Sequence, residues 1–125
     1  MGYDHVISKS KTNWIFIRTH KNRICLDIDS IIYCQAEGSY TRLISNSSHP
    51  NVILSKSLKV IQILIQNNLF IRCHNSYVVN IKKVISFSSK KRHLLIDSQS
   101  IPISRKYFDK VVNVLLVNGI QDIYR

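Results

Sequence analysis

Short runs of apolar and β-branched residues, separated by turn formers, occupy most of this chain, and this organisation constrains the fold more than any other feature. Ile24, Leu26 and Ile28 alternate with polar neighbours, which is the pattern of a strand with one buried face. Runs of this kind are short, and turn formers such as Gly38 and Pro50 separate them. The pattern predicts roughly eight to ten short strands, in which consecutive strands pair as antiparallel hairpins.

Two segments change to the helical period and predict two helices. One begins at its N-cap Ser57 and covers about residues 57 to 67. The other can be capped by Ser104 and ends near Gly119. The hydrophobic residues at helical spacing are Leu58, Ile61 and Ile65 in the first segment, and Phe108, Val111, Val112 and Leu115 in the second. The expected fold class is mainly β with two helices.

The 125 residues are enough for one domain with a single core. Residues 1–12 are polar and basic without a period, so we predict a flexible tail or linker end there and a domain over residues 13–125. No apolar run approaches the roughly 20 residues that cross a bilayer, so no membrane contact is expected from this chain. Cys25, Cys34 and Cys73 are odd in number and lack the C-x-x-C spacing, which favours a reducing, cytoplasmic location over a disulfide framework.

The charge balance points to an anionic partner. Lysine and arginine number 18 against 7 acidic residues, for a formal net charge of +11. Such an excess is the electrostatic footprint of a nucleic-acid binder. The alternative is a non-catalytic basic module that binds RNA or an acidic protein partner. RNA modules that stack bases need aromatic residues exposed on a sheet, whereas the aromatic residues here mostly occupy core-like strand positions.

The sequence offers no catalytic, cofactor or metal site, and we predict that the protein is not an enzyme. Cys73 and His74 are adjacent in a predicted strand, so their side chains point to opposite faces and do not converge as a nucleophile and base. The five histidines lack the short spacings of zinc ligands. The glycine motifs that cradle nucleotide phosphates are also missing from the sequence.

Side chains able to contact DNA concentrate in three predicted turns, "EGSYTR" at 37–42, "RCHNS" at 72–76 and "SRK" at 104–106. Arginine can read guanine, asparagine can read adenine, and lysine or serine can hold phosphates. The third turn opens a predicted helix, whose N-terminus favours a phosphate. Taken singly, each turn also fits an ordinary polar surface.

Together these segments resemble the LytTR DNA-binding domain, the output module of many bacterial response regulators. The resemblance covers roughly residues 14–117 and is carried by "LDIDSIIYCQAEGSYTRLI", "SLKVIQIL", "LFIRCHNSYVVNIKKVISF" and "IPISRKYFDKV". The third of these holds the pattern F-x-R-x-H-x-S-[YF]-x-V-N complete, from Phe70 to Asn80. The resemblance implies an elongated arrangement of short antiparallel β-sheets, whose loops enter successive major grooves of DNA.

By position, the resemblance places base contacts in the three turns and phosphate contacts beside them. The expected base contacts are Tyr40 or Thr41 with Arg42, then His74 and Asn75, and finally Arg105. The expected phosphate contacts are Ser39, Arg72, Ser76, Ser104 and Lys106. One member type has a histidine where this chain has Tyr40 or Thr41, so the base preference of the first turn is open.

The function that the resemblance implies is sequence-specific binding of double-stranded DNA by a bacterial transcription regulator of a two-component system. LytTR sites are typically paired imperfect repeats, so we expect a monomer without DNA and two protomers on one site. Control would come from an upstream receiver or membrane domain that this chain lacks, or the domain would act as a stand-alone regulator.

The resemblance also bears on two residues of the third segment. One member type pairs a cysteine matching Cys73 with a cysteine matching Ser100, and the serine implies that this redox switch is absent here. Cys73 is then expected to be a packed strand residue. Asn80 is expected to form a turn and not to read a base.

Overall fold

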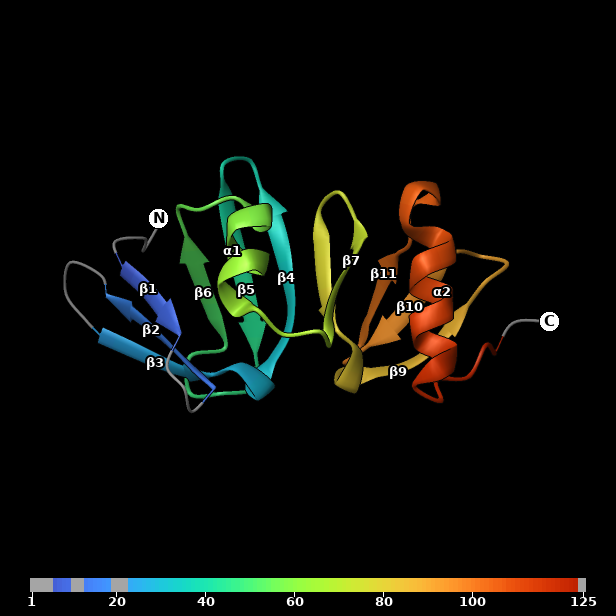
Figure 1. Cartoon of the computed structure of the whole chain (residues 1–125), viewed down its shortest axis with the longest axis horizontal. Helices are drawn as coiled ribbons and strands as arrows, with labels where there is room; N and C mark the ends of the chain where they lie inside the picture. Colours follow the sequence, from blue (N-terminus) through green and yellow to red (C-terminus); the bar gives the residue numbers. More distant parts are fainter. Residues whose placement is uncertain (1–5, 10–12, 19–22, 124–125) are drawn as a thin grey trace. The chain divides into compact units, whose positions relative to one another are not determined.

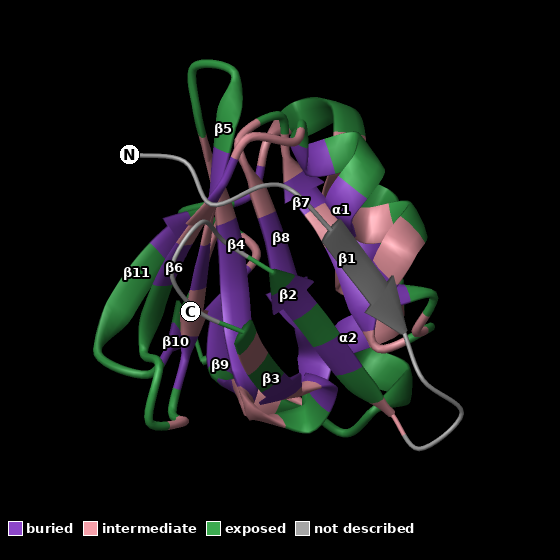
Figure 2. Cartoon of the chain, turned by 90° about the vertical axis from the view of Figure 1, so that its left-hand side faces the viewer, coloured by how far each residue is buried: buried purple, intermediate pink, exposed green. Residues whose placement is uncertain are grey.

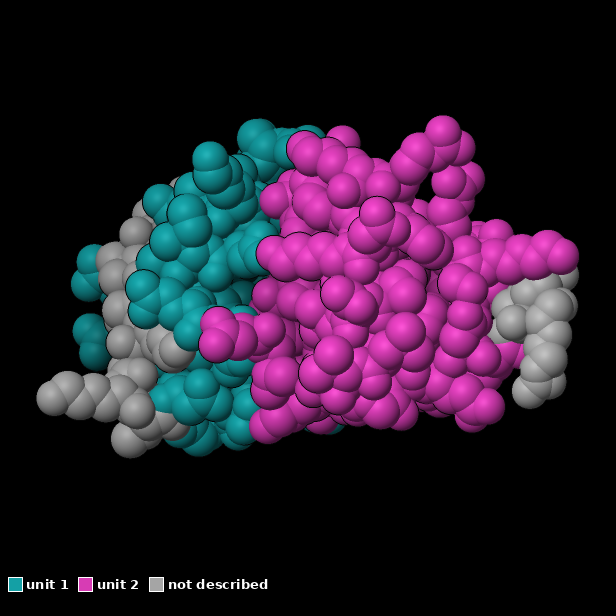
Figure 3. All heavy atoms as spheres, turned by 45° about the vertical axis from the view of Figure 1, so that its right-hand side comes forward, with its two compact units in different colours: residues 1–67 teal, residues 68–125 magenta. Residues whose placement is uncertain are grey.

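The computed structural model describes residues 6–9, 13–18 and 23–123 (Figure 1). The chain divides into two compact units, residues 1–67 and residues 68–125, which Figure 3 draws in teal and magenta. Each unit has its own short antiparallel strands and its own α-helix. The predicted fold class, mainly β with two helices, is confirmed.

The first sheet of unit 1 is built from β1 (Val6–Lys9), β2 (Trp14–Arg18) and β3 (Arg23–Asp27), in the order β1-β2-β3. Both pairings are antiparallel. Exposed and buried residues alternate along β2, as the green and purple bands of Figure 2 show, with Ile15 and Ile17 in the core. The range predicted as a tail therefore contains a strand, because β1 lies within residues 1–12.

The second group of strands in unit 1 consists of β4 (Ile31–Glu37), β5 (Tyr40–Ser45) and β6 (Asn51–Leu54). They pair in chain order as an antiparallel meander, and the 3-10 turn η1 (Ile28–Ser30) leads into β4. Helix α1 (Leu58–Ile65) packs against β4 and β5. The predicted first helix is confirmed.

The N-cap of α1 forms as its sequence indicates, because the Ser57 hydroxyl accepts a hydrogen bond from the Val60 N–H. The helix ends where Gln66 takes a left-handed conformation with φ of 48°. The side chains at helical spacing, Leu58, Ile61 and Ile65, are all buried.

Unit 2 begins with a hairpin and continues with a sheet and a helix. The hairpin is β7 (Phe70–His74) with β8 (Tyr77–Asn80), followed by the 3-10 turn η2 (Ile81–Lys83). The sheet has the order β11-β10-β9, and its strands are β9 (Val84–Ser88), β10 (His93–Ile96) and β11 (Gln99–Pro102).

The predicted second helix forms in two parts, the 3-10 turn η3 (Arg105–Tyr107) and helix α2 (Phe108–Val117). Val111 and Leu115 of α2 are buried, as their spacing predicts. Ser104 stands at the N-cap position of η3, but its hydroxyl makes no capping hydrogen bond, so the capping role expected for it is wrong. No helix in the described part of the chain is long and apolar enough to span a membrane.

The end of the described chain is fixed to β9. Asp122 forms a parallel bridge with Phe87, and the Ser89 N–H and hydroxyl both donate to the Asp122 carboxylate. Asn80 accepts a hydrogen bond from the Lys82 N–H through its side chain and starts η2, which confirms that it is a turn former. Cys73 is fully buried, as expected of a packed strand residue.

The cysteines differ in reactivity because they differ in burial. Burial raises the pKa of the Cys34 and Cys73 thiols to about 12, whereas Cys25 is exposed. The thiolate is the nucleophile, so the two buried thiols should react far more slowly than an exposed thiol at pH 8. We predict that iodoacetamide alkylates Cys25 alone in the folded protein, as peptide mass spectrometry would report.

Unfolding in guanidinium should make all three cysteines reactive, which serves as the control. Alkylation of Cys73 at the rate of Cys25 in the folded protein would contradict its burial.

Candidate functional site

The first predicted turn forms a tight hairpin between β4 and β5. Glu37 pairs with Tyr40, so Gly38 and Ser39 are the two loop residues. Gly38 has φ of 62°, which suits the turns that join two antiparallel strands through two residues. Ser39 and Tyr40 are exposed at this turn, and 42% of the Tyr40 surface is accessible.

Arg42 follows the turn and is held by three hydrogen bonds. Its Nε and Nη2 donate to the two Glu37 carboxylate oxygens at 2.5 and 2.9 Å. Its Nη1 donates to Asn51 Oδ1 at 2.7 Å. The hydrogen bond from Arg42 lowers the pKa of the Glu37 carboxyl, and the same bond raises the pKa of Arg42. The only cation predicted to contact a base in this turn is therefore already paired with a carboxylate.

Thr41 points the other way and is fully buried. Its hydroxyl donates to the Lys56 carbonyl oxygen at 2.7 Å. Alternation along β5 explains the difference, because successive strand residues face opposite sides. Of the two residues considered for the same contact, Tyr40 is accessible and Thr41 is part of the core.

The second predicted turn joins β7 to β8 and is braced by an arginine. His74 pairs with Tyr77, which leaves Asn75 and Ser76 as the loop residues. Arg72 donates from Nε to the His74 carbonyl at 2.9 Å and from Nη2 to the Asn75 carbonyl at 2.6 Å. Its guanidinium thus satisfies carbonyl groups of the turn, which leaves Asn75 exposed at the tip.

The imidazole of His74 is oriented from both sides. Its Nδ1 accepts a hydrogen bond from the Ser76 N–H at 3.0 Å. Its ring also lies edge to face against Tyr77, with 5.7 Å between the centroids. Since Nδ1 is the acceptor, the neutral ring carries its proton on Nε2. The His74 Nε2–H is therefore the group of this ring that can donate a hydrogen bond to a ligand.

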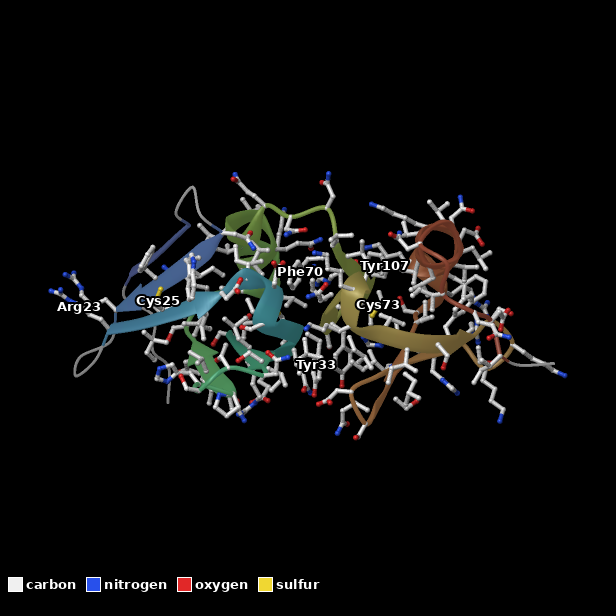
Figure 4. All side chains as sticks on the ribbon, turned by 90° about the horizontal axis from the view of Figure 1, so that it is seen from below. Arg23, Cys25, Tyr33, Phe70, Cys73 and Tyr107 are labelled. Atoms are coloured by element: carbon white, nitrogen blue, oxygen red, sulfur yellow. The ribbon has the colours of Figure 1, made fainter. Side chains whose placement is uncertain are left out.

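The third predicted turn lies beside the second. The Ser104 N–H donates to the Cys73 carbonyl at 2.9 Å, and the Tyr107 hydroxyl donates to Asn75 Oδ1 at 3.4 Å. Cys73 and Tyr107 are labelled in Figure 4 on these two elements. The structure of unit 2 thus brings the turns at 72–76 and 104–106 together. Tyr107 was not predicted as a site residue, although its position next to "SRK" was a signal.

The residues of the third turn differ in accessibility. Arg105 and Lys106 are exposed, and the Lys106 Nζ lies 5.3 Å from the centroid of the Tyr107 ring. The Ser104 hydroxyl oxygen is buried and has no hydrogen-bond partner among the described residues. Within that same part of the chain, no three His, Cys, Asp or Glu residues are grouped as a metal site would need.

Comparisons with known proteins agree with this arrangement of strands and turns. Residues 21–116 match the sequence model of the family described as the LytTr DNA-binding domain. A solved structure described as the LytTr DNA-binding domain of a response regulator from Bacillus cereus superposes with a TM-score of 0.67. The two chains are 20% identical, and the match covers 83% of this chain and 96% of the other. A comparison with curated proteins gives no match.

Substitution of Thr41 tests whether its hydroxyl stabilises the fold or contacts DNA. Thr41→Val keeps the shape of the side chain but leaves the Lys56 carbonyl without its donor. The free energy of unfolding should fall by about 1–3 kcal/mol, which denaturant titration would measure. Tyr40→Phe, at an exposed position, should change it by less than about 0.5 kcal/mol. Unchanged stability together with weaker DNA binding by Thr41→Val would show that the hydroxyl serves DNA.

Proposed function

This chain belongs to the LytTR family of DNA-binding domains, and from that premise we propose that it binds double-stranded DNA at specific sequences and regulates transcription. The observation that carries the proposal is the joining of the two turns in unit 2 by the Ser104–Cys73 and Tyr107–Asn75 hydrogen bonds. These bonds fix exposed polar side chains at set positions, and base readout requires such preorganisation.

In unit 2 we assign base contacts to His74, Asn75 and Arg105. The His74 Nε2–H can donate to the guanine N7 or O6 or to the thymine O4 in the major groove. Asn75 keeps both amide hydrogens and the second lone pair of Oδ1 for an adenine edge, since Tyr107 uses one lone pair. The exposed guanidinium of Arg105 suits a guanine.

In unit 1 we assign the base contact to Tyr40, with Arg42 beside it. Thr41, predicted as an alternative to Tyr40, is better explained as a core residue because it is fully buried. Glu37 occupies two of the five N–H donors of Arg42 and neutralises its charge. Glu37 thus limits the affinity that this arginine can add.

Phosphate contacts are proposed for Ser39, Ser76 and Lys106. The sequence also predicted phosphate contacts for Arg72 and Ser104, and both support the interface more directly through the fold. Arg72 braces the turn at 72–76, and the Ser104 N–H ties η3 to β7. We propose that they position other residues, and that any phosphate contact of theirs is secondary.

The wider setting follows from the family. We propose that the protein acts in the cytoplasm as a non-enzymatic regulator and that two protomers, each a monomer without DNA, occupy paired imperfect repeats. Insertion of the turns into successive major grooves and control by a receiver or membrane domain are part of the same proposal.

The experiment that tests the function is selection of bound duplexes from a random pool, followed by titration with the selected site, a random duplex and RNA. The selected site should bind about a thousandfold more tightly than random DNA at physiological salt. Similar affinity for all three ligands would instead make the chain a general polyanion binder.

Arg105→Ala tests one base contact. The affinity for the selected site should fall by a factor corresponding to about 1–3 kcal/mol, and base choice should relax at one position. Arg92→Asn is the control, because it removes one positive charge from the exposed β9–β10 turn. It should reduce the affinity for the selected and the random duplex slightly and by the same factor. If Arg105→Ala also reduces the affinity for both duplexes by the same factor, Arg105 contacts the DNA backbone and not a base.

Glu37→Gln tests whether Glu37 restrains Arg42. The variant removes a negative charge and releases the guanidinium, so it should add about one contact to phosphate. The slope of log K against log salt should then become more negative by about one. Because the pKa of Glu37 is lowered, wild-type protein should keep the pair throughout neutral and mildly acidic pH. Asp97→Asn, in the exposed β10–β11 turn, is the matched control. Equal slopes for wild type and Glu37→Gln would place this turn away from DNA.

A further inference from the structure

Strands β2 and β3 carry exposed apolar and cationic side chains that lie outside the three turns assigned to DNA. Along β2, Trp14 is 38% and Phe16 is 44% exposed. Phe16 lies opposite Cys25 of β3, which is also exposed. Figure 4 shows Cys25 on β3 and the Arg23 side chain extending away from the ribbon. Exposed aromatic residues of this kind usually mark a contact surface.

A hollow opens on this sheet. It has a volume of about 150 Å³ and is lined by Phe16, Ile17, Arg18, Arg23, Ile24 and Cys25. Apart from the two arginines, every lining residue is apolar or a cysteine. A cavity of roughly this size holds a benzene molecule, so there is room for one large apolar side chain.

Two of the residues that line the hollow, Arg18 and Arg23, are neighbouring arginines. Arg18 pairs with Arg23 across the two strands, and both are exposed. Like charges directly opposite each other destabilise a sheet. Neither arginine forms an ion pair with an acidic residue of the described segments, where the pair of Arg42 and Glu37 is the salt bridge found. The sequence between them, Thr19 to Asn22, adds a lysine and no acid. An anion from outside would relieve this repulsion.

We propose that this hollow is a docking site for a segment of a partner protein that inserts one large apolar side chain and places carboxylates on Arg18 and Arg23. Trp14 and Phe16 are exposed and not core-like as expected, so bases of single-stranded nucleic acid could stack on them. The hollow suits an inserted side chain better than a base stacked on a flat face. Displacement of the bound peptide by a single-stranded oligonucleotide would identify nucleic acid as the occupant and overturn the proposal. A second copy of the chain is disfavoured because the net charge is +11. The site lies outside the three turns assigned to DNA, so the proposal does not depend on the proposed function.

The test uses two labelled peptides and fluorescence anisotropy. The probe is Glu-Glu-Phe-Glu-Glu, carrying its dye on a Gly-Ser linker, and the control peptide replaces Phe with Ser. The folded chain should bind the Phe peptide about tenfold more tightly, as expected for one buried aromatic side chain. Equal binding of the two peptides would overturn the proposal, because it would mean attraction by charge alone.

Variants locate the site on the chain. Arg23→Gln should reduce the affinity for the Phe peptide about tenfold, because a charge-assisted hydrogen bond to a peptide carboxylate is lost. Arg92→Asn removes the same charge in unit 2 and should leave its affinity within about twofold. Equal losses in both variants would overturn the proposal. Phe16→Ser should remove the preference for Phe over Ser.

Cys25 reports binding without any substitution, since it lines the hollow and is exposed. Saturation with the Phe peptide should slow its alkylation by iodoacetamide several-fold, whereas the Ser peptide should not. A duplex that binds the three turns should leave this protection unchanged. Binding of anionic vesicles that depends on Arg23, with no preference between peptides, would identify a membrane as the occupant and overturn the proposal.

Discussion

The candidate interface of unit 2 depends on the burial of Cys73. Its side chain is fully buried, whereas Arg72 and His74 on either side of it are partly exposed, and the register of the β7–β8 pairing shifts between these two residues. Its carbonyl accepts the Ser104 N–H, which holds η3 beside the hairpin. The buried side chain and the backbone carbonyl of this one residue thus contribute to the packing of the hairpin and to its contact with η3. A polar substitution here would disturb both turns at once.

The hairpin of unit 1 works by the same alternation but with a different result. Glu37, Tyr40 and Arg42 share one face, and the register makes Glu37 and Arg42 diagonal neighbours. Thr41 faces the core between Tyr40 and Arg42. The turn thus presents an aromatic residue beside a neutralised ion pair, whereas the turns of unit 2 present an exposed arginine and a histidine donor.

Apolar runs between turn formers were sufficient to predict most of the strands, and helical spacing was sufficient to predict α1, because burial of one helix face leaves a regular spacing in the sequence. These patterns could not reveal β1, since Val6–Lys9 is too short and polar to show a period. They also could not choose between Tyr40 and Thr41 without the register. Once the two-residue turn at Gly38 and Ser39 is known, alternation places Tyr40 outward and pairs Glu37 with Arg42. The Tyr107–Asn75 hydrogen bond joins residues that are 32 positions apart in the sequence, and no local sequence pattern predicts such a contact.

A count of basic residues overstates the charge that DNA can meet. Arg42 is neutralised by Glu37, Arg72 is bound to carbonyl groups of its own turn, and Arg18 and Arg23 belong to another sheet. Arg105 and Lys106 are left exposed at the head of η3. The net charge of +11 favours encounter with any polyanion, while the sequence specificity that we propose depends on a few polar groups of the turns. Because His74 and Asn75 are held by hydrogen bonds within the fold, the specificity that we propose depends on the rigidity of their turn and not on the charge excess.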